Sequence, residues 1–151
     1  MKMSSRIERC HICRGVMESD KTVFFPAIVA NELDQLWGFN DRSFHRTCLE
    51  KDVVGRKALR EVERYSDYLA TYRPGNYVCR LCGKRIEHPD DMLSTGVLSS
   101  EETDPLYSLN HLQVHRNCLK GNMLEILHSA LDKGILKNDR FKKLLPEREK
   151  S

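Results

Sequence analysis

The sequence lacks a segment suited to crossing a membrane or to directing secretion. Its longest apolar run, residues 23–30, is interrupted by Pro26 and is far shorter than the roughly 20 residues of a membrane-spanning helix. Residues 1–9 carry several charges and contain no apolar core of the kind found in signal peptides. We therefore expect an intracellular, cytoplasmic protein without a membrane partner, in which thiols stay reduced.

A strong excess of charge of one sign is also missing, because 25 Lys and Arg residues oppose 22 Asp and Glu residues. A protein whose main task is to bind phosphates would normally carry a basic stripe, and here a modest basic excess occurs only after Leu136. Neither a glycine-rich phosphate loop nor a nucleophile motif is present. These absences argue against nucleotide chemistry and against covalent catalysis.

What the sequence does contain is six cysteines in 151 residues. A chain of this length has room for two small units, and a unit of half that length cannot bury much apolar surface. Such units usually need disulfides or a metal ion to hold them together. In a reducing compartment, closely spaced cysteines favour a metal.

The spacing of the cysteines repeats within the chain. The segment 10–13 (CHIC) returns as 79–82 (CRLC), and the segment 44–49 (FHRTCL) returns as 114–119 (VHRNCL), at offsets of 69 and 70 residues. We interpret this similarity as an internal duplication. The similarity extends to residues outside the cysteine and histidine motifs. At an offset of 70, the two copies align Asp34, Leu36, Trp37, Phe39 and Asn40 with Asp104, Leu106, Tyr107, Leu109 and Asn110.

Each copy reads Cys-x2-Cys, then 31 or 32 residues, then His-x2-Cys. A disulfide framework would not explain a histidine at the same place in both copies, whereas zinc ligation does. His111 lies four residues before His115 and could replace it as a ligand, although His111 aligns with Asp41, which favours His115. The pattern therefore predicts two structural zinc ions. The predicted ligands are Cys10, Cys13, His45 and Cys48 in the first unit and Cys79, Cys82, His115 and Cys118 in the second.

The local pattern predicts an α+β fold of two tandem treble-clef-like units. Gly15 and Gly83 suit the positive φ of a tight turn after each Cys-x2-Cys pair. Short strands are expected over 22–29 and 92–98, and the last two ligands should open a helix in each unit. We expect a first unit over 1–73, a second unit over 74–136, and a basic, frayed or disordered tail over 137–151.

Several polar and aromatic residues invite a functional interpretation beside a structural one. Trp37 and Tyr107 could anchor a partner, but core packing is the preferred interpretation. Asn40 and Asn110 are expected to cap a helix or turn. The second unit also carries an acidic insert, which is either a solvated face or an attraction for a basic protein. Its acidic residues are Glu87, Asp90, Asp91, Glu101, Glu102 and Asp104.

The ligand spacing, with Phe44 before His45, resembles the zinc finger of poly(ADP-ribose) polymerase and DNA ligase. That resemblance implies recognition of DNA breaks. Cys-x2-Cys followed by His-x2-Cys is also similar to the first half of a LIM domain, a protein-binding adaptor module. The sequence departs from the LIM pattern because its interval is much longer and the second ligand set is absent. No binding residue is carried over from either family.

A site closed by four protein ligands has no position for a catalytic water, so we expect that the protein is not an enzyme. The leading hypothesis is a zinc-binding adaptor that recognises another protein. A nucleic-acid-binding finger pair is the first alternative, and a metal-dependent nuclease using His88 or His111 is the second. The identity of the partner, the pathway and the oligomeric state do not follow from the sequence.

Overall fold

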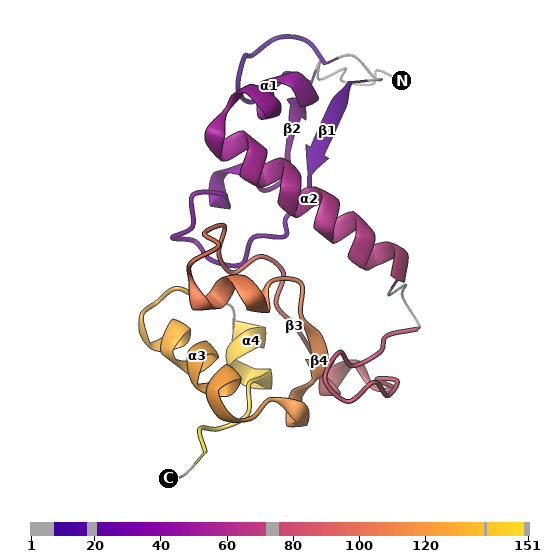
Figure 1. Ribbon diagram of the computed structural model, residues 1–151, viewed down its shortest axis with the longest axis vertical. Helices are drawn as coiled ribbons and strands as arrows, with labels where there is room; N and C mark the ends of the chain where they lie inside the picture. The colour runs from indigo at the N-terminus through magenta and orange to yellow at the C-terminus, as the bar shows by residue number, and fades with distance from the viewer. Residues whose placement is uncertain (1–7, 18–20, 72–75, 138, 150–151) are drawn as a thin grey trace, which may run out of the picture.

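The computed structural model describes residues 8–17, 21–71, 76–137 and 139–149. Two units lie one above the other, and they are called here the first unit (8–71) and the second unit (76–149) (Figure 1). The chain is a small protein of mixed helix and sheet, in agreement with the predicted α+β class. The first unit contains β1 (Thr22–Phe25), β2 (Arg42–His45), α1 (Arg46–Lys51) and α2 (Val53–Thr71). The second contains β3 (Met92–Ser94), β4 (Gln113–His115), α3 (Gly121–Asp132) and α4 (Asp139–Leu144).

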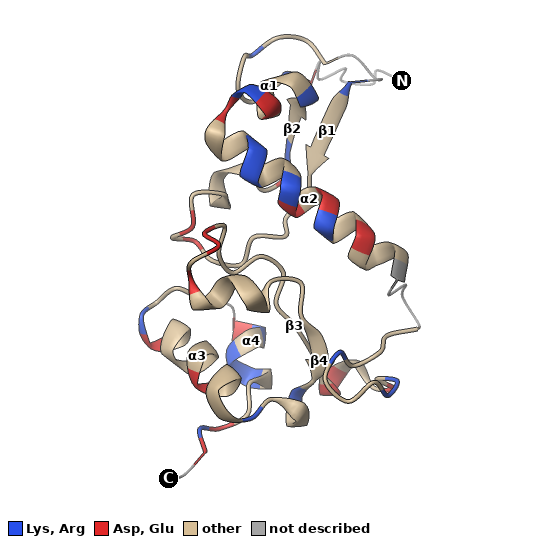
Figure 2. Ribbon diagram, in the orientation of Figure 1, with Lys and Arg blue, Asp and Glu red and all other residues tan. Residues whose placement is uncertain are grey.

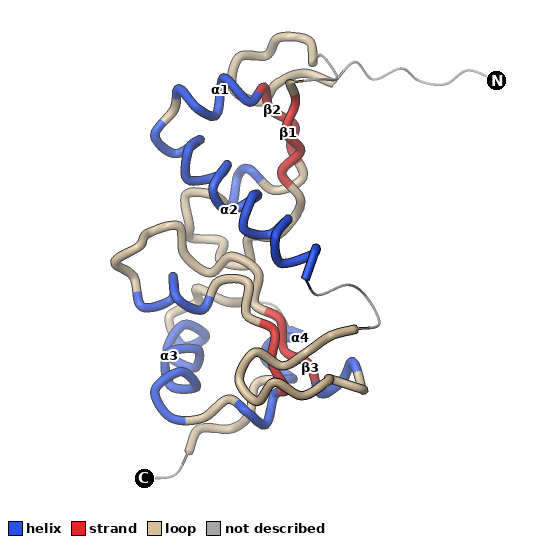
Figure 3. The backbone as a smooth tube through the Cα atoms, turned by 45° about the vertical axis from the view of Figure 1, so that its right-hand side comes forward, coloured by secondary structure: helices blue, strands red, loops and turns tan. Residues whose placement is uncertain are grey.

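In the described residues each unit has a two-stranded antiparallel sheet, in which β1 pairs with β2 and β3 pairs with β4. Figure 3 shows these strands among long loops. Both strands predicted from the sequence are shorter than expected. β1 ends at Phe25 because Pro26 has no N–H for a sheet hydrogen bond. Residues beyond the strands pair between the units instead, where Val29 forms a parallel bridge with Val97. Val97 N donates to Ile28 O at 2.8 Å, so backbone hydrogen bonds join the segment after β1 to the segment after β3.

The helix that follows the last ligands differs between the units. In the first unit α1 begins directly after His45 and contains Cys48, as predicted. In the second unit the helix that follows the ligands is present as α3, but it does not begin at the ligands as predicted, because residues Arg116–Cys118 form only a 3-10 turn. The backbone of Lys120 is extended (φ −147°, ψ 165°), and this extension separates the turn from α3.

The tail predicted to be frayed or disordered contains α4 and packs against the second unit. Phe141 and Leu145 are buried there, with exposed fractions of 7% and 6%. The basic composition of this segment obscures a short apolar face, and that face supplies the driving force for packing. The described part of the tail, 139–149, therefore belongs to the second unit.

Each unit has its own apolar core, and each core also contacts one residue of the other unit. Val97 of the second unit packs in the core of the first, and Ala30 of the first packs against the core of the second. The predicted boundary between 73 and 74 lies outside the described residues. No helix in the described ranges has the length and apolar character needed to span a membrane.

Candidate metal centres

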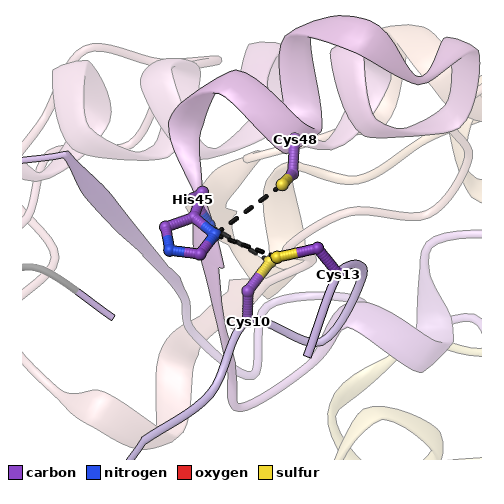
Figure 4. A group of neighbouring side chains, drawn as sticks. All are labelled: Cys10, Cys13, His45 and Cys48. Carbon is purple, nitrogen blue, oxygen red and sulfur yellow. Dashed lines mark hydrogen bonds between the residues drawn. The ribbon is translucent and has the colours of Figure 1, made fainter. Parts of the chain in front are cut away.

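The first cluster brings Cys10, Cys13, His45 and Cys48 together (Figure 4). Their ligand atoms all lie within 4.8 Å of one another. The two cysteines of the Cys-x2-Cys pair come from a tight turn, in which Arg14 N donates to Cys10 O at 2.8 Å. The other two ligands come from the end of β2 and from the first turn of α1.

The turn that holds the first cysteine pair uses an unexpected residue for its left-handed backbone. Arg14 adopts φ 66°, whereas Gly15 was predicted to supply the positive φ. Gly15 has a different role, because its N–H donates to Cys13 Sγ at 3.3 Å and a Cβ would lie 3.3 Å from that sulfur. In the second unit Gly83 adopts φ 75°, as predicted.

The His45 ring is oriented by a second hydrogen bond outside the cluster. Its Nε2 lies 3.0 Å from Val16 O, and because a carbonyl only accepts, Nε2 carries the proton. Nδ1 is then the atom with a free lone pair, and it faces Cys13 Sγ at 3.2 Å and Cys48 Sγ at 3.7 Å. Metal-binding histidines commonly have this arrangement, in which the remote N–H is fixed by a carbonyl or carboxylate.

The second cluster repeats the geometry of the first with Cys79, Cys82, His115 and Cys118. His115 Nδ1 lies 3.3 Å from Cys82 Sγ and 3.9 Å from Cys118 Sγ. The backbone N–H of His115 donates to Cys79 Sγ at 3.2 Å, as that of His45 donates to Cys10 Sγ at 3.3 Å. In both clusters the first cysteine is buried and the second is exposed.

The electrostatics of the thiols in the two clusters are alike. Burial raises the pKa of Cys10, but hydrogen bonds from the backbone of Cys13, His45 and Ile12 outweigh burial and lower it to about 6. The pKa of Cys79 is lowered to about 6 by the same balance. Burial, together with the neighbouring cysteines, raises the pKa of Cys48 and of Cys118 to about 11. Four crowded donors of this kind are suited to a cation that offsets the negative charge of their thiolates.

The spacing of the donor atoms fits a tetrahedral ion. With metal–sulfur and metal–nitrogen bonds of roughly 2.3 and 2.0 Å, tetrahedral ligands lie about 3.5 Å apart. The sulfur–nitrogen distances to His45 and His115 range from 3.2 to 3.9 Å. Each cluster can therefore hold one metal ion with little rearrangement.

The remaining histidines lie outside both clusters. His111 is buried, and its Nε2 lies 3.1 Å from Glu61 Oε1 of α2. The structure thus groups His115, and not His111, with the three cysteines. His11 packs edge-on against Phe44, and His88 is exposed just before a short 3-10 turn.

The aromatic pair at corresponding positions does not pack as predicted. Trp37 is 42% exposed instead of lying in the core. Tyr107 is half-buried, and the guanidinium groups of Arg60 and Arg64 lie over its ring at 5.3 and 4.9 Å from the ring centre. Tyr107 therefore takes part in the contact between α2 and the second unit through cation–π interactions.

Two residues of the acidic insert form ion pairs with side chains of α2. Glu101 pairs with Lys57 at 2.7 Å, and Glu102 pairs with Arg60. Glu61, which no sequence pattern singled out, lies at the centre of the same interface and is fully buried. Its carboxylate contacts His111 as well as two arginines of its own helix. Glu101 and Glu102 therefore serve the contact between the units, whereas Glu87, Asp90 and Asp91 are exposed.

No family model, curated protein or solved structure matches this chain. The similarity to the zinc finger of poly(ADP-ribose) polymerase and DNA ligase and to LIM domains thus stays a similarity of ligand spacing. What the structure provides is two groups of donors suited to metal ions.

Proposed function

We propose that both clusters bind structural zinc and that the protein is a non-catalytic scaffold that recognises another protein. The observation that carries the zinc proposal is the donor set, three sulfurs and one imidazole nitrogen within 4.8 Å of one another in each cluster. Zn²⁺ favours this set, and four protein ligands leave no open position for a reacting water. In this proposal the zinc ions serve folding and not catalysis.

Purification without chelators followed by metal analysis tests this proposal. Two zinc ions per chain are expected. Cys13→Ser and Cys82→Ser should each retain about one ion, because each removes a ligand from one cluster only. A content well below two in the unmodified protein, or the loss of both ions in a single variant, would contradict two independent sites.

We further infer that the units descend from one treble-clef ancestor by duplication. Contacts recur at corresponding positions: Leu36 N donates to Asp34 Oδ1, and Leu106 N donates to Asp104 Oδ1, both at 2.9 Å. Left-handed backbone also recurs at Asp41 (φ 57°) and at His111 (φ 56°). Shared backbone chemistry at residues that bind no metal supports common descent of the two units.

The choice of a protein partner rests on how the cationic side chains are used. Figure 2 shows that α2 carries both positive and negative residues, and that the first of these along the helix are positive. Lys57, Arg60 and Arg64 are paired with carboxylates or lie over Tyr107, so this helix offers little free charge to a phosphate backbone. By contrast, Ile12 and Leu81 expose 41% and 44% of their surface at matching places in the two cysteine turns. Exposed apolar side chains on rigid turns favour contact with a protein.

Affinity purification followed by mass spectrometry tests the partner class. A double variant, Ile12→Asp with Leu81→Asp, should lose a copurifying protein that the unmodified chain retains. Val53→Asp is the matched control, because Val53 is equally apolar and 62% exposed but lies at the start of α2. Retention of every partner by the double variant would exclude the cysteine turns as the contact.

A nucleic-acid-binding finger pair is the alternative that one observation favours. Lys142 and Lys143 are exposed on α4, near Arg140. Binding of this kind predicts an affinity that falls steeply with added salt. Titrations with broken, intact and single-stranded DNA should distinguish the two proposals, because a flat response with all three removes the alternative.

The surroundings of His111 do not support the nuclease alternative, for which His111 and His88 are the candidate bases. His111 is 5% exposed and contacts Glu61, which leaves it poorly placed to receive a proton from an attacking water. DNA cleavage that survives both His111→Ala and His88→Ala would exclude these residues as its base.

A further inference from the structure

A cavity of about 630 Å³ lies between the two units, away from both metal centres. The second half of α2, the segment after β1 and the strand β3 contribute to its wall. None of the eight metal-ligand candidates lines it. Its volume falls within the range of small-molecule sites, which often form at interfaces between domains.

The wall of this cavity is unusually aromatic for a protein with few aromatic residues. Trp37, Tyr65, Tyr68 and Tyr77 all line it, and Trp37 is the single tryptophan of the chain. Leu69 adds an apolar side chain that is 41% exposed. Aromatic faces interact well with flat rings, by about 0.5–1.5 kcal/mol beyond the area they bury.

Most polar side chains in the wall are already engaged within the protein, although Nδ1 of His111, which also lines the cavity, is buried without a hydrogen-bond partner. Gln113 accepts from the Tyr68 hydroxyl and donates to Val78 O. Thr95 Oγ1 donates to Leu109 O at 2.6 Å and accepts from Leu112 N at 2.9 Å. A peptide brings backbone amides that need new partners when they are buried. The cavity therefore suits a ligand with few polar groups better than it suits a peptide.

We propose that this cavity binds a flat, mainly apolar aromatic small molecule, and that binding there is independent of the adaptor function proposed above. The ligand would lie between the aromatic faces of α2 and those of Trp37 and Tyr77. At one side of the wall, Glu32 and Lys137 pair with each other at 3.6 Å. Because these two charges neutralise one another, the site does not require a charged ligand.

The single tryptophan gives a direct experiment. In ¹⁵N-labelled, zinc-loaded protein the Trp37 indole N–H gives one isolated NMR signal, which can be followed while 4-phenylphenol is added. A saturable shift is expected. The matched probe 4-cyclohexylcyclohexanol has the same size and hydroxyl group but no aromatic ring, and it should bind at least about tenfold more weakly.

Two variants locate the binding site. Leu69→Asp places a carboxylate in the wall and should weaken 4-phenylphenol binding by about tenfold or more. Leu33→Asp makes the same change at a leucine that is 69% exposed and does not line the cavity, and it should leave binding unchanged. Circular dichroism and zinc content check that both variants fold.

Three results would overturn the proposal. Equal binding of the two probes would exclude an aromatic ligand class. Equal binding by the folded Leu69→Asp variant and the unmodified protein would exclude this cavity. Tighter binding of a blocked peptide, N-acetyl-Ala-Trp-Ala-amide, than of 4-phenylphenol would identify a peptide groove instead. Since capture of a protein partner is scored separately, either proposal can fail alone.

Discussion

Two asparagines hold the backbone of the segments through which the units contact each other. Asn40 Oδ1 accepts from Val29 N at 3.1 Å, and its Nδ2 donates to Val29 O at 3.0 Å. Asn110 does the same with Ser99, at 3.1 and 2.7 Å, and also accepts from Leu98 N at 2.7 Å. A primary amide can satisfy both the donor and the acceptor of one residue, as a neighbouring strand would.

Asn110→Ala should therefore be strongly destabilising, since it leaves two buried N–H groups and one carbonyl without partners. We expect a loss of about 2–4 kcal/mol in the free energy of unfolding. Urea unfolding of the zinc-loaded protein measures this loss. The control is Asn122→Ala, because Asn122 is exposed on α3. Equal midpoints for both variants would show that the bracing bonds do not stabilise the fold.

The contact between the units also depends on Glu61, whose carboxylate is buried. Burial raises its pKa, but the hydrogen bond with His111 and the charges of Arg64 and Arg60 outweigh burial and lower the pKa below the ordinary value of 4.5. A lowered pKa in the folded state means that the ionised form stabilises the fold. This contribution is fully present above pH 4.5 and is lost as the pH falls through the folded-state pKa.

The variant Glu61→Gln, which cannot ionise, should reveal this contribution. At neutral pH its melting temperature should lie below that of the unmodified protein, and the gap should narrow as the pH falls below 4.5. Acid protonates the metal-ligand candidates of both proteins alike, so the difference between the two proteins is the informative quantity. A gap that stays constant over this pH range would show that ionisation of Glu61 contributes nothing.

Sequence reasoning grouped the metal-ligand candidates but missed the residues that join the units. Cysteines at fixed spacing are rare enough that their pattern alone suggests a shared site. Asn110 and Glu61 have no such signature, because their partners lie in segments that come together only in the folded chain. Asn110 was assigned to a local turn, and its long-range bracing depends on Ser99, which no pattern connects to it.

At the scale of elements, the first unit depends on a close approach of α1 and α2. A Cβ at Gly55 would lie 2.6 Å from Leu49 O and 2.8 Å from Leu49 Cα. The break between the two helices occurs at Asp52, and Gly55 lies inside α2. Gly55 is thus required for packing and not for a turn.

Gly55→Ala should force the two helices apart. We expect a loss of about 1–3 kcal/mol in stability, the usual effect of overpacking against backbone atoms. Gly38→Ala is the matched control, because a Cβ there would have no neighbour within 4 Å. Urea unfolding of the two variants provides the comparison. Similar stabilities would mean that α1 can shift away from α2 without cost.

The strands and the tail show why sequence patterns misjudged element lengths. The apolar residues after Phe25 read as a continuing strand, yet their partners lie in the other unit, and hydrophobic pattern alone does not reveal such a partner. In the tail, Phe141 and Leu145 were outnumbered by charges. Their burial depends on α3 and β3 offering a surface, which composition does not describe.

At the scale of the whole molecule, α2 is part of the first unit in the sequence, but its side chains contact both units. Its beginning packs on α1, and side chains from Lys57 onward contact the second unit. Tyr68, in the last part of the helix, donates to Gln113 of β4. Because Gln113 lies two residues before His115, the end of α2 rests on the strand that carries a candidate metal ligand.

Removal of the second metal centre should therefore loosen the end of a helix in the first unit. In the zinc-loaded Cys82→Ser variant, we expect amide hydrogen exchange at residues 61–69 to accelerate by at least about tenfold. Residues 53–56, which pack on α1, should change little, because metal binding and folding are coupled locally. Hydrogen exchange followed by mass spectrometry resolves the two halves of α2. Cys13→Ser is the reciprocal control and should accelerate exchange in β1, α1 and residues 53–56. If Cys82→Ser left residues 61–69 as protected as before, the contacts of Glu61 and Tyr68 with the second unit would not stabilise the end of the helix, and the two units would fold independently.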